Sequence, residues 1–254
     1  MNVMYTCDDN YVWLMGISTI SLFENNKTIE DLQVYLLGDN ISQENKDKLK
    51  KIGDQYGRKI QVIEIPPFTI PTALISARWP LAAFTRLFSG EILPVDVDKI
   101  LYLDCDTIVS GDISELEKVS FNGNIVMGVK DCISRTYKKN IGLDNNSLYI
   151  NAGVLLLDVT ELRKININKK IDEYMQQYVE FINYADQDIL NGVFKNCIGE
   201  LSPKFNVMTL NVVHTYAQME QLRRPTNYYN YKEWEEAKNN PAIIHYTTNM
   251  LDNM

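Results

Sequence analysis

The chain contains little cysteine and no apolar run long enough to cross a membrane. Its four cysteines, Cys7, Cys105, Cys132 and Cys197, form no CxxC pair. This excludes zinc ribbons and dithiol redox motifs and favours a reduced, intracellular chain. No segment reaches the roughly 20 apolar residues of a transmembrane helix, and the N-terminus lacks a signal-peptide pattern. We therefore expect a cytoplasmic protein without a transmembrane segment.

Positive charge is also scarce. The chain has 25 Lys and Arg residues against 33 Asp and Glu residues, which gives a net charge of −8. Binding to a nucleic-acid backbone needs clustered Lys and Arg, so we expect no nucleic-acid partner. A phosphorylated ligand would instead need a local partner, such as a metal ion, an arginine or backbone amides.

Apolar residues make up 45% of the 254 residues, enough for a substantial core in one large α/β domain or two small ones. Strand and helix patterns alternate from the N-terminus onward. Strands are predicted at Val3–Cys7, Leu32–Leu37 and Ile60–Ile65, with helices at Trp13–Phe23 and Ser42–Tyr56 between them. This alternation predicts an α/β fold with a largely parallel central sheet.

The second half of the chain is less regular. We expect a helix from Pro80 to about Ser89, a loop over Lys138–Leu148, a helix over Ile171–Phe181 and irregular structure over Pro203–Tyr231. Further strands are predicted at Ile125–Val129, Tyr149–Asp158 and Ala242–Tyr246, and a short charged helix around Trp234.

Two carboxylates follow the apolar run Ile100–Leu103, which has the composition of a buried strand. On an extended chain Asp104 and Asp106 point the same way, because side chains alternate with a period of two. Two neighbouring negative charges at the end of a buried strand are costly unless a cation holds them. A divalent cation prefers oxygen ligands, so the stretch predicts a metal site at the carboxyl end of a central strand. The alternative is an Asp-rich turn without a ligand.

Four further places carry candidate functional residues. Arg86 is either a phosphate or carboxylate partner or a surface residue. Asn151-Ala152-Gly153 lets a ligand approach the backbone, or marks a bulge. Asp186 is a good helix N-cap, yet the adjacent Gln187 adds polarity that capping does not require. His245, one of two histidines, stands at a strand end, where a structural role is commoner than a catalytic one.

Six motifs together resemble the family 8 glycosyltransferases, and the resemblance runs from Val3 to about Tyr246. This family comprises retaining enzymes with the GT-A fold, among them bacterial lipopolysaccharide galactosyl- and glucosyltransferases and glycogenin. The motifs are Asp8-Asp9-Asn10-Tyr11, Arg86, Leu101-Tyr102-Leu103-Asp104-Cys105-Asp106, Asn151-Ala152-Gly153-Val154-Leu155-Leu156, Asp186-Gln187-Asp188-Ile189-Leu190-Asn191 and Ile244-His245-Tyr246.

The resemblance implies a GT-A nucleotide-diphospho-sugar transferase fold, with a single mixed, mostly parallel central sheet flanked by helices. It implies one domain over 1–254, with a nucleotide-binding half at about 1–110 and an acceptor- and metal-completing half at about 111–254. The implied activity is metal-dependent, retaining transfer of a hexose from UDP-glucose or UDP-galactose to a glycan acceptor, such as lipopolysaccharide or another surface glycan.

By the same resemblance, Asp104, Asp106 and His245 hold Mn²⁺, with Mg²⁺ as the alternative ion. The metal bridges the donor diphosphate and acts as a Lewis acid on the UDP leaving group. The donor-binding residues that the resemblance implies are Thr6, Asp8, Asn10, Tyr11, Arg86, Asp104, Cys105, Asn151, Ala152 and Gly153.

Three residues are implied at the reacting centre. Gln187 matches the position beneath the anomeric carbon, Asp186 lies beside the donor sugar, and Asp131 lies where some members meet the acceptor. An amide is a poor nucleophile, so double displacement through Gln187 competes with a front-face substitution in which UDP leaves and its phosphate accepts the acceptor proton.

The chain departs from the family after His245, where the usual Gly and Lys-Pro-Trp are absent. We expect either a chain cut short after Met254 or one missing phosphate contact. Many bacterial members carry a basic, apolar C-terminal tail for peripheral membrane contact, which is not present here. Two alternatives follow: an inactive GT-A-fold binder of UDP-sugars, and a haloacid-dehalogenase-type phosphatase suggested by Asp104-Cys105-Asp106-Thr107. That phosphatase motif normally lies near the N-terminus.

Overall fold

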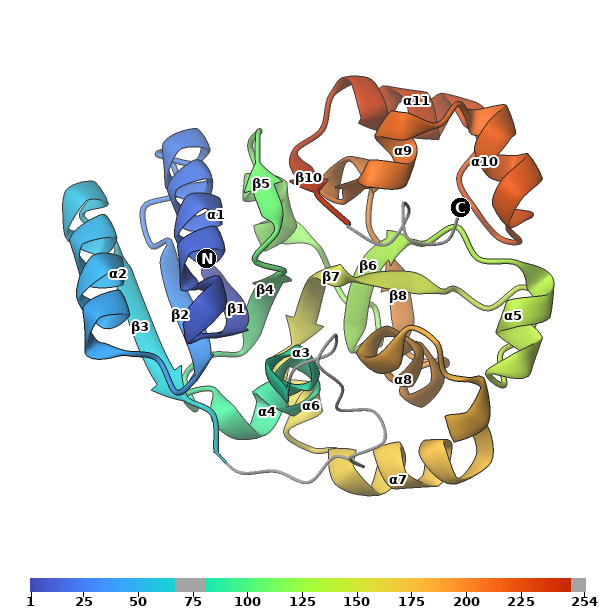
Figure 1. Ribbon diagram of the computed structural model, residues 1–254, viewed down its shortest axis with the longest axis horizontal. Helices are drawn as coiled ribbons and strands as arrows, with labels where there is room; N and C mark the ends of the chain where they lie inside the picture. Colours follow the sequence, from blue (N-terminus) through green and yellow to red (C-terminus); the bar gives the residue numbers. More distant parts are fainter. Residues whose placement is uncertain (67–80, 248–254) are drawn as a thin grey trace.

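The computed structural model describes residues 1–66 and 81–247. Within them, seven strands form one large sheet in the order β3-β2-β1-β4-β7-β6-β8, with helices packed around it (Figure 1). The strands are β1 (Asn2–Asp8), β2 (Gln33–Asp39), β3 (Lys59–Glu64), β4 (Lys99–Leu103), β6 (Val126–Lys130), β7 (Ile150–Asp158) and β8 (Ile198–Glu200).

Most neighbouring strands of this sheet are parallel, as the sequence pattern predicted. The strand β1 runs parallel to β2 and to β4, β2 parallel to β3, and β6 parallel to β8. The exception is β7, which is antiparallel to both β4 and β6. The predicted α/β class and the mixed, mostly parallel sheet are therefore confirmed. Because β7 is antiparallel, its first residues lie at the sheet edge where β1 and β4 end.

The sheet is buried on both faces. Successive side chains of β4 point to opposite faces and belong alternately to two hydrophobic cores. Leu101 and Leu103 belong to one hydrophobic core, which includes the helix residues Met15, Leu22 and Leu49. Ile100 and Tyr102 belong to the other core, which includes Phe84, Ile171 and Ile189. Helices cover both faces, which explains the continuous apolar run of β4.

The predicted early helices are confirmed, as is the helix around Trp234. Ser42 caps α2 (Gln43–Tyr56) by accepting a hydrogen bond from the Asn45 N–H, and Gly57 ends it with a φ of 62°. The other helices before β6 in the described part of the chain are η1 (Asp9–Tyr11), α1 (Val12–Asn25), α3 (Leu81–Thr85), η3 (Arg86–Phe88), α4 (Ser89–Ile92) and η4 (Ser114–Lys118). After β7 come α6 (Val159–Leu162), α7 (Ile167–Tyr178), η5 (Val179–Phe181), α8 (Ala185–Val193) and α11 (Tyr231–Asn239).

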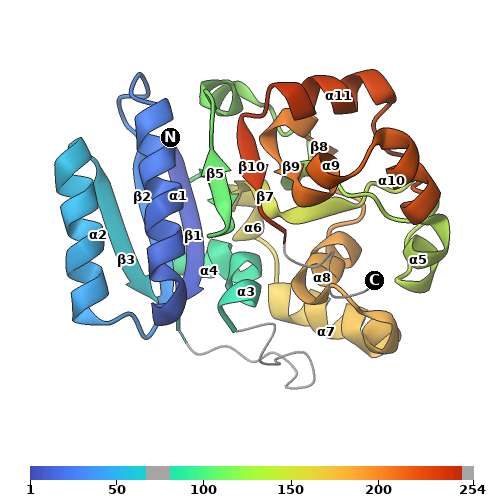
Figure 2. The same ribbon diagram turned by 45° about the horizontal axis from the view of Figure 1, so that its top comes forward.

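A second sheet of three short strands lies beside the large one in the described chain. Its order is β5-β10-β9, where β5 is Thr107–Val109, β10 is Ile243–His245 and β9 is Val207–Met208. The pairing of β10 is antiparallel to β5, with His245 opposite Thr107, and parallel to β9, with His245 opposite Met208. Figure 2 shows β5 and β10 side by side. This small sheet carries the C-terminal histidine to the end of β4.

Two expected irregular segments contain regular structure. The predicted loop over Lys138–Leu148 is wrong at its start, because α5 (Arg135–Asn140) is capped by Ser134, whose Oγ accepts from the Tyr137 N–H. The segment predicted as irregular over Pro203–Tyr231 contains η6 (Pro203–Phe205), β9, α9 (Thr209–Val213) and α10 (Tyr216–Arg223). These elements are too short for a periodic pattern to reveal them.

Two other expectations are settled differently. The predicted N-cap role of Asp186 is wrong, because α8 begins at Ala185 and Tyr184 precedes it without a side-chain cap. The predicted helix start at Pro80 lies outside the described residues, as does the sequence after Thr247. Over residues 1–66 and 81–247, no helix combines the length and apolar character needed to cross a bilayer.

Candidate active site

A cavity of about 400 Å³ opens where β1 and β4 end and β7 begins. Of the residues predicted for a site, the following line it: Thr6, Asp8, Tyr11, Arg86, Asp104, Cys105, Asp106, Asp131, Asn151, Ala152, Gly153, Asp186, Gln187 and His245. Asn10, by contrast, is exposed and is not among the described lining residues. Asp8 accepts a hydrogen bond from the Asn10 N–H at 2.9 Å, so it caps the short helix η1.

The chain turns sharply between the two predicted metal carboxylates. The Asp104 N–H donates to the Gly153 carbonyl at 2.8 Å, which continues the pairing of β4 with β7. The Thr107 N–H then donates back to the Asp104 carbonyl at 3.2 Å, which closes a tight turn. The expectation that Asp104 and Asp106 lie on one extended segment is therefore wrong. They converge because the turn between them brings Asp106 back toward the same point.

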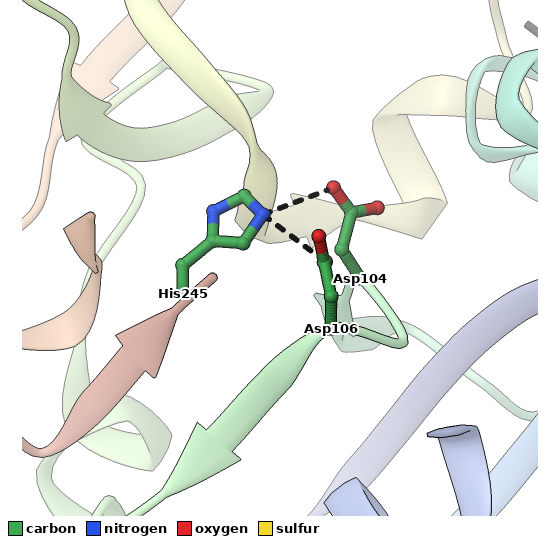
Figure 3. A group of neighbouring side chains, drawn as sticks. All are labelled: Asp104, Asp106 and His245. Carbon is green, nitrogen blue, oxygen red and sulfur yellow. Dashed lines mark ion pairs between the residues drawn. The ribbon is translucent and has the colours of Figure 1, made fainter. Parts of the chain in front are cut away.

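Both carboxylates meet the imidazole of His245 (Figure 3). The Nε2 atom lies 3.5 Å from Asp104 Oδ2 and 3.3 Å from Asp106 Oδ1. The Tyr246 N–H donates to the Asp106 carbonyl at 2.9 Å, so the end of β10 is tied to the turn. One potential ligand atom from each of the three residues lies within 4.8 Å of the others. The three side chains thus form a compact group that can hold a metal ion.

The surroundings of this group fit a small divalent cation. Two carboxylates and one imidazole are a mixed oxygen and nitrogen donor set, which suits Mn²⁺ better than Ca²⁺. Space is kept by Gly153, because a Cβ atom there would lie 2.1 Å from His245 Cε1 and 2.7 Å from Asp104 Oδ2. A glycine at this position is therefore needed for Asp104 and His245 to approach each other as they do.

The carboxylates also shape the protonation of the histidine. Burial opposes the charged imidazolium, but the hydrogen bond and the charge of Asp106, followed by the charge of Asp104, raise the pKa of His245 above its usual value. Burial likewise opposes the charge of Asp106, yet the hydrogen bond from His245 lowers the pKa of that carboxyl. The group therefore favours the charged carboxylate that a metal ion would bind.

Arg86 is a buried ion-pair residue and not a surface residue. Its Nη2 lies 2.9 Å from Asp104 Oδ1, and its Nε lies 3.2 Å from Asp186 Oδ2. It also donates to the Ala152 carbonyl, and its guanidinium carbon lies 4.2 Å from the centre of the Tyr102 ring. Burial works against its charge, but Asp104 and then Asp186 raise the pKa of Arg86 above its usual value. Arg86 thus bridges the turn that carries Asp104 and the helix α8.

Asp186 titrates nearer neutrality than an ordinary carboxyl. Burial raises the pKa of Asp186 to about 6, partly offset by Arg86 and reinforced by the negative charge of Asp104. Its first-turn position in α8 points the carboxylate toward Arg86 instead of capping the helix. The buried site therefore contains one arginine shared between two carboxylates.

The side-chain amide of Gln187 is held by four hydrogen bonds. Its Oε1 accepts from the Ala152 N–H at 3.1 Å and from Asn151 Nδ2 at 3.0 Å. Its Nε2 donates to Asp131 Oδ2 at 2.9 Å and meets the Tyr149 hydroxyl at 3.0 Å. Because the Ala152 N–H can only donate, the amide orientation is determined, and both lone pairs of Oε1 are engaged.

Asp188 supports this amide from behind. It is fully buried and accepts hydrogen bonds from the hydroxyls of Tyr149 and Tyr137, each at 2.6 Å. It also accepts from the backbone N–H groups of Asn183 and Tyr184 at 2.9 and 2.8 Å. The polar character of the Asp186–Asp188 cluster is therefore explained: one residue pairs with Arg86, one faces the cavity, and one anchors the start of α8.

Several lining residues could not be found from the sequence. They share no motif with one another and come from elements far apart in the chain. These additional lining residues are Cys7, Leu14, Ala83, Cys132, Ile133, Tyr184, Met208, Leu210, Arg223 and Thr247. Asn206 lies outside this set, yet it contacts His245 directly. It belongs to the weakly patterned segment around β9, so no pattern in the sequence indicated this contact.

Comparisons with known proteins give a consistent result. The model of Glycosyl transferase family 8 matches residues 2–250. General stress protein A of Bacillus subtilis is 26% identical over 249 residues, which cover 97% of this chain and 85% of that protein. Lipopolysaccharide 1,2-glucosyltransferase of Escherichia coli K12 is 28% identical over 250 residues, which cover 97% of this chain and 71% of that protein.

A solved structure agrees with the sequence matches. The crystal structure of galactosyltransferase LgtC in complex with donor and acceptor sugar analogues superposes with a TM-score of 0.79. The two proteins are 27% identical, and the match covers 98% of this chain and 88% of that one. The GT-A-like fold that the resemblance implied is confirmed by this likeness.

Replacing Asp186 by Asn should change how stability depends on pH in the metal-free protein. The native carboxyl has a pKa of about 6, whereas an unfolded chain gives about 3.9. The protonated form of Asp186 therefore makes its full contribution to the stability of the native state at pH values below the pKa of the unfolded chain. That contribution is lost as the pH rises through 6. Relative to D186N, the wild-type free energy of unfolding should fall by roughly 1–2 kcal/mol between about pH 5 and about pH 7.5.

Urea titrations at both pH values with EDTA present would measure this difference. The exposed Asp144 offers a matched Asp-to-Asn control, because it lies outside the buried ion-pair group. Parallel pH dependences for wild type and D186N would contradict the raised pKa.

Proposed function

The chain belongs to glycosyl transferase family 8, and on that premise we propose that it transfers a hexose, glucose or galactose, from a UDP-sugar to a glycan acceptor with retention of configuration. The observation that carries the proposal is the convergence of the group Asp104, Asp106 and His245 with Arg86 and Gln187 around one cavity. Similarity to a lipopolysaccharide 1,2-glucosyltransferase supports a lipopolysaccharide or another cell-surface glycan as the acceptor.

Asp104, Asp106 and His245 would hold the divalent cation, Mn²⁺ or alternatively Mg²⁺. When bound, the cation supplies positive charge for the donor diphosphate and for the departing UDP. Without such a charge a chain of net charge −8 would repel a nucleotide diphosphate. Arg86 gives little help there, because its guanidinium is already shared by Asp104 and Asp186. Its role in this proposal is to orient Asp104 for the cation.

The nucleoside end of the donor would lie where β1 ends. Thr6, Asp8 and Tyr11 line this part of the cavity, and the Thr6 hydroxyl hydrogen-bonds the Tyr102 hydroxyl at 3.2 Å. The half-exposed ring of Tyr11 offers an aromatic face for a base, and Asp8 offers a carboxylate acceptor. We propose residues of about 1–110 as the nucleotide half and about 111–254 as the half that completes the metal site and meets the acceptor.

The geometry of Gln187 favours front-face substitution over double displacement. A nucleophile needs a free lone pair, but Oε1 already accepts from the Ala152 N–H and from Asn151. The carbonyl dipole of this amide can still stabilise positive charge that develops at a sugar held beside it. We therefore assign Gln187 to electrostatic stabilisation and to positioning of Asp131, which accepts from its Nε2 at 2.9 Å.

The acceptor would enter at the other end of the cavity, beside Asp131. The lining of the cavity also includes Cys132 and Ile133, which follow Asp131 in the chain, together with Tyr184 and Arg223. Arg223 Nη1 lies 3.3 Å from the Tyr184 hydroxyl, so both side chains present polar atoms at a largely apolar wall. Such a mixture suits a sugar, which offers hydroxyl groups on its edges and C–H groups on its faces.

The phosphatase alternative has no support. The family model and the superposed galactosyltransferase both match nearly the whole chain. The residues Asp104-Cys105-Asp106-Thr107 occupy a tight turn in which Arg86, Tyr102 and His245 engage the carboxylates. The positions at which the family usually has Gly and Lys-Pro-Trp follow His245 by a few residues and lie outside the described residues.

UDP should bind to the protein only in the presence of Mn²⁺. Calorimetric titration of UDP, first with Mn²⁺ and then with EDTA, measures this without knowledge of the sugar or the acceptor. D106A and H245A should each weaken Mn²⁺-dependent binding by about tenfold or more, because each removes one ligand.

The control for these variants is His214, the other histidine of the chain, whose replacement by Ala should leave binding unchanged. Binding of UDP with equal affinity in EDTA would rule out the metal-bridged site. Binding that survives in both D106A and H245A would show that the site is wrongly placed.

Gln187→Ala should reduce turnover more than donor affinity. Removal of a dipole that acts on developing charge lowers kcat, typically by about 100-fold, and changes KM much less. Release of UDP from the donor, followed at several donor concentrations, separates the two constants. The exposed Gln177 provides a control, since Q177A should alter neither. A pure increase of KM in Q187A would exclude a role at the reacting centre.

A further inference from the structure

Asn206 connects the histidine of the metal group to the amide network of Gln187. The residue is 1% exposed, and it immediately precedes β9, the strand that pairs in parallel with β10. Its Oδ1 lies 3.0 Å from His245 Nδ1, and its Nδ2 lies 2.9 Å from Asn151 Oδ1. A polar chain therefore runs from Gln187 through Asn151 and Asn206 to His245.

The direction of every hydrogen bond in this chain follows from backbone groups that can only donate. The Gly153 N–H donates to one side-chain atom of Asn151 at 2.9 Å, so that atom is the oxygen Oδ1. Asn151 Nδ2 then faces Gln187 Oε1, whose identity the Ala152 N–H fixes in the same way. The assignment of the Asn151 amide is thus supported from both ends.

The same logic reaches the histidine ring. Because Asn151 Oδ1 is an acceptor, the atom of Asn206 that faces it is the donor Nδ2, and the other atom is the acceptor Oδ1. Oδ1 faces His245 Nδ1, which must therefore carry a proton. When the ring is neutral, the lone pair is on Nε2, the atom that faces Asp104 and Asp106.

We propose that Asn206 is a positioning residue that holds His245 in the Nδ1–H tautomer, with the Nε2 lone pair directed at the cation site. This inference rests on the proposed metal-dependent function. Asn206 touches neither donor nor acceptor in this scheme and acts only through the imidazole. A histidine that binds a metal through one nitrogen commonly donates from the other to such a partner, which fixes the orientation of the ring.

The small sheet explains why this residue can do so. Val207 pairs with Ile244, and Met208 pairs with His245, so the residue before β9 is brought to the side of the ring that faces away from Asp104 and Asp106. Without an acceptor at Nδ1, the imidazole would distribute between two tautomers and could rotate. Only one of these tautomers offers a lone pair to a cation at Nε2.

The test is the affinity of the nucleotide-free protein for Mn²⁺, measured by the electron paramagnetic resonance signal of the free ion. Removal of the acceptor in N206A should weaken Mn²⁺ binding by about 10- to 100-fold, the range typical of such outer partners. N206D keeps an oxygen acceptor for His245 Nδ1 but gives up the donor to Asn151 Oδ1, so it should bind Mn²⁺ more tightly than N206A.

Asn211 provides a matched control from the same part of the fold. It is also buried, and its hydrogen-bond partners differ: its Oδ1 accepts from the Met208 N–H at 3.1 Å, and its Nδ2 lies 3.5 Å from the Tyr228 hydroxyl. N211A disturbs the β9 region without removing the Nδ1 partner, so it should bind Mn²⁺ as wild type does. Weakening of N211A to the same extent as N206A would overturn the proposal, because it would indicate general loosening of the small sheet.

Nitrogen-15 NMR of histidine-labelled protein reads the tautomer directly, with the diamagnetic Mg²⁺ at saturation in place of Mn²⁺. The chain has two histidines, and His214→Gln assigns the signals. In wild type, His245 should be protonated at Nδ1 and unprotonated at Nε2. In N206A, the signals should no longer correspond to this single tautomer. A proton on Nε2 in wild type would overturn the assignment.

The outcomes separate this inference from the proposed function. Wild type that binds Mn²⁺ while N206A binds it equally well would overturn the role of Asn206 alone. Wild type that binds no Mn²⁺ would overturn the metal-dependent function, and the role of Asn206 would fall with it.

Discussion

The antiparallel pairing of β10 with β5 is the interaction on which the site depends. The strand β5 starts directly after the turn that carries Asp104 and Asp106, and the pairing places His245 opposite Thr107. A candidate metal ligand at position 245 thereby meets two candidate ligands from the middle of the chain. The parallel pairing of β10 with β9 adds Asn206 on the other side of the imidazole. Two short strand pairs therefore bring Asp104, Asp106 and His245 together with Asn206.

Charge balance is the second constraint. The large sheet ends in a cavity that contains Asp104, Asp106 and Asp186, and ionised carboxylates in such surroundings are costly without partners. Arg86 serves two of them, and His245 serves the pair at the turn. Since one guanidinium is shared, the buried site keeps an excess of negative charge, which a divalent cation would offset. The hydrogen bonds of the Gln187 amide are saturated, so the neighbouring polar groups are already positioned before any substrate binds.

Local patterns predicted the parts of this arrangement that depend on local physics. The apolar run of β4 indicated a buried strand, and the alternation of strands and helices predicted the α/β class. The cation site indicated by the carboxylates after β4 stays a prediction. The position of His245 beside them was implied only by the resemblance to a family, because β5, β9 and β10 are two or three residues long and carry no periodic signal. Asn206 was not predicted at all, since its role arises from a contact with a residue 39 positions away. Asp186 was misread as a cap because capping is a local rule, whereas its partner Arg86 comes from a different element.

The most direct test of metal-dependent, retaining transfer is the configuration of the sugar released from the donor. UDP-glucose and UDP-galactose would be incubated separately with the protein and Mn²⁺, and proton NMR spectra would be recorded after addition of EDTA. We expect UDP and free sugar to appear from one of the two donors, with the sugar first detected as the α anomer, and neither product in samples kept in EDTA throughout. First appearance of the β anomer, equal release in EDTA, or no release from either donor would contradict metal-dependent, retaining transfer.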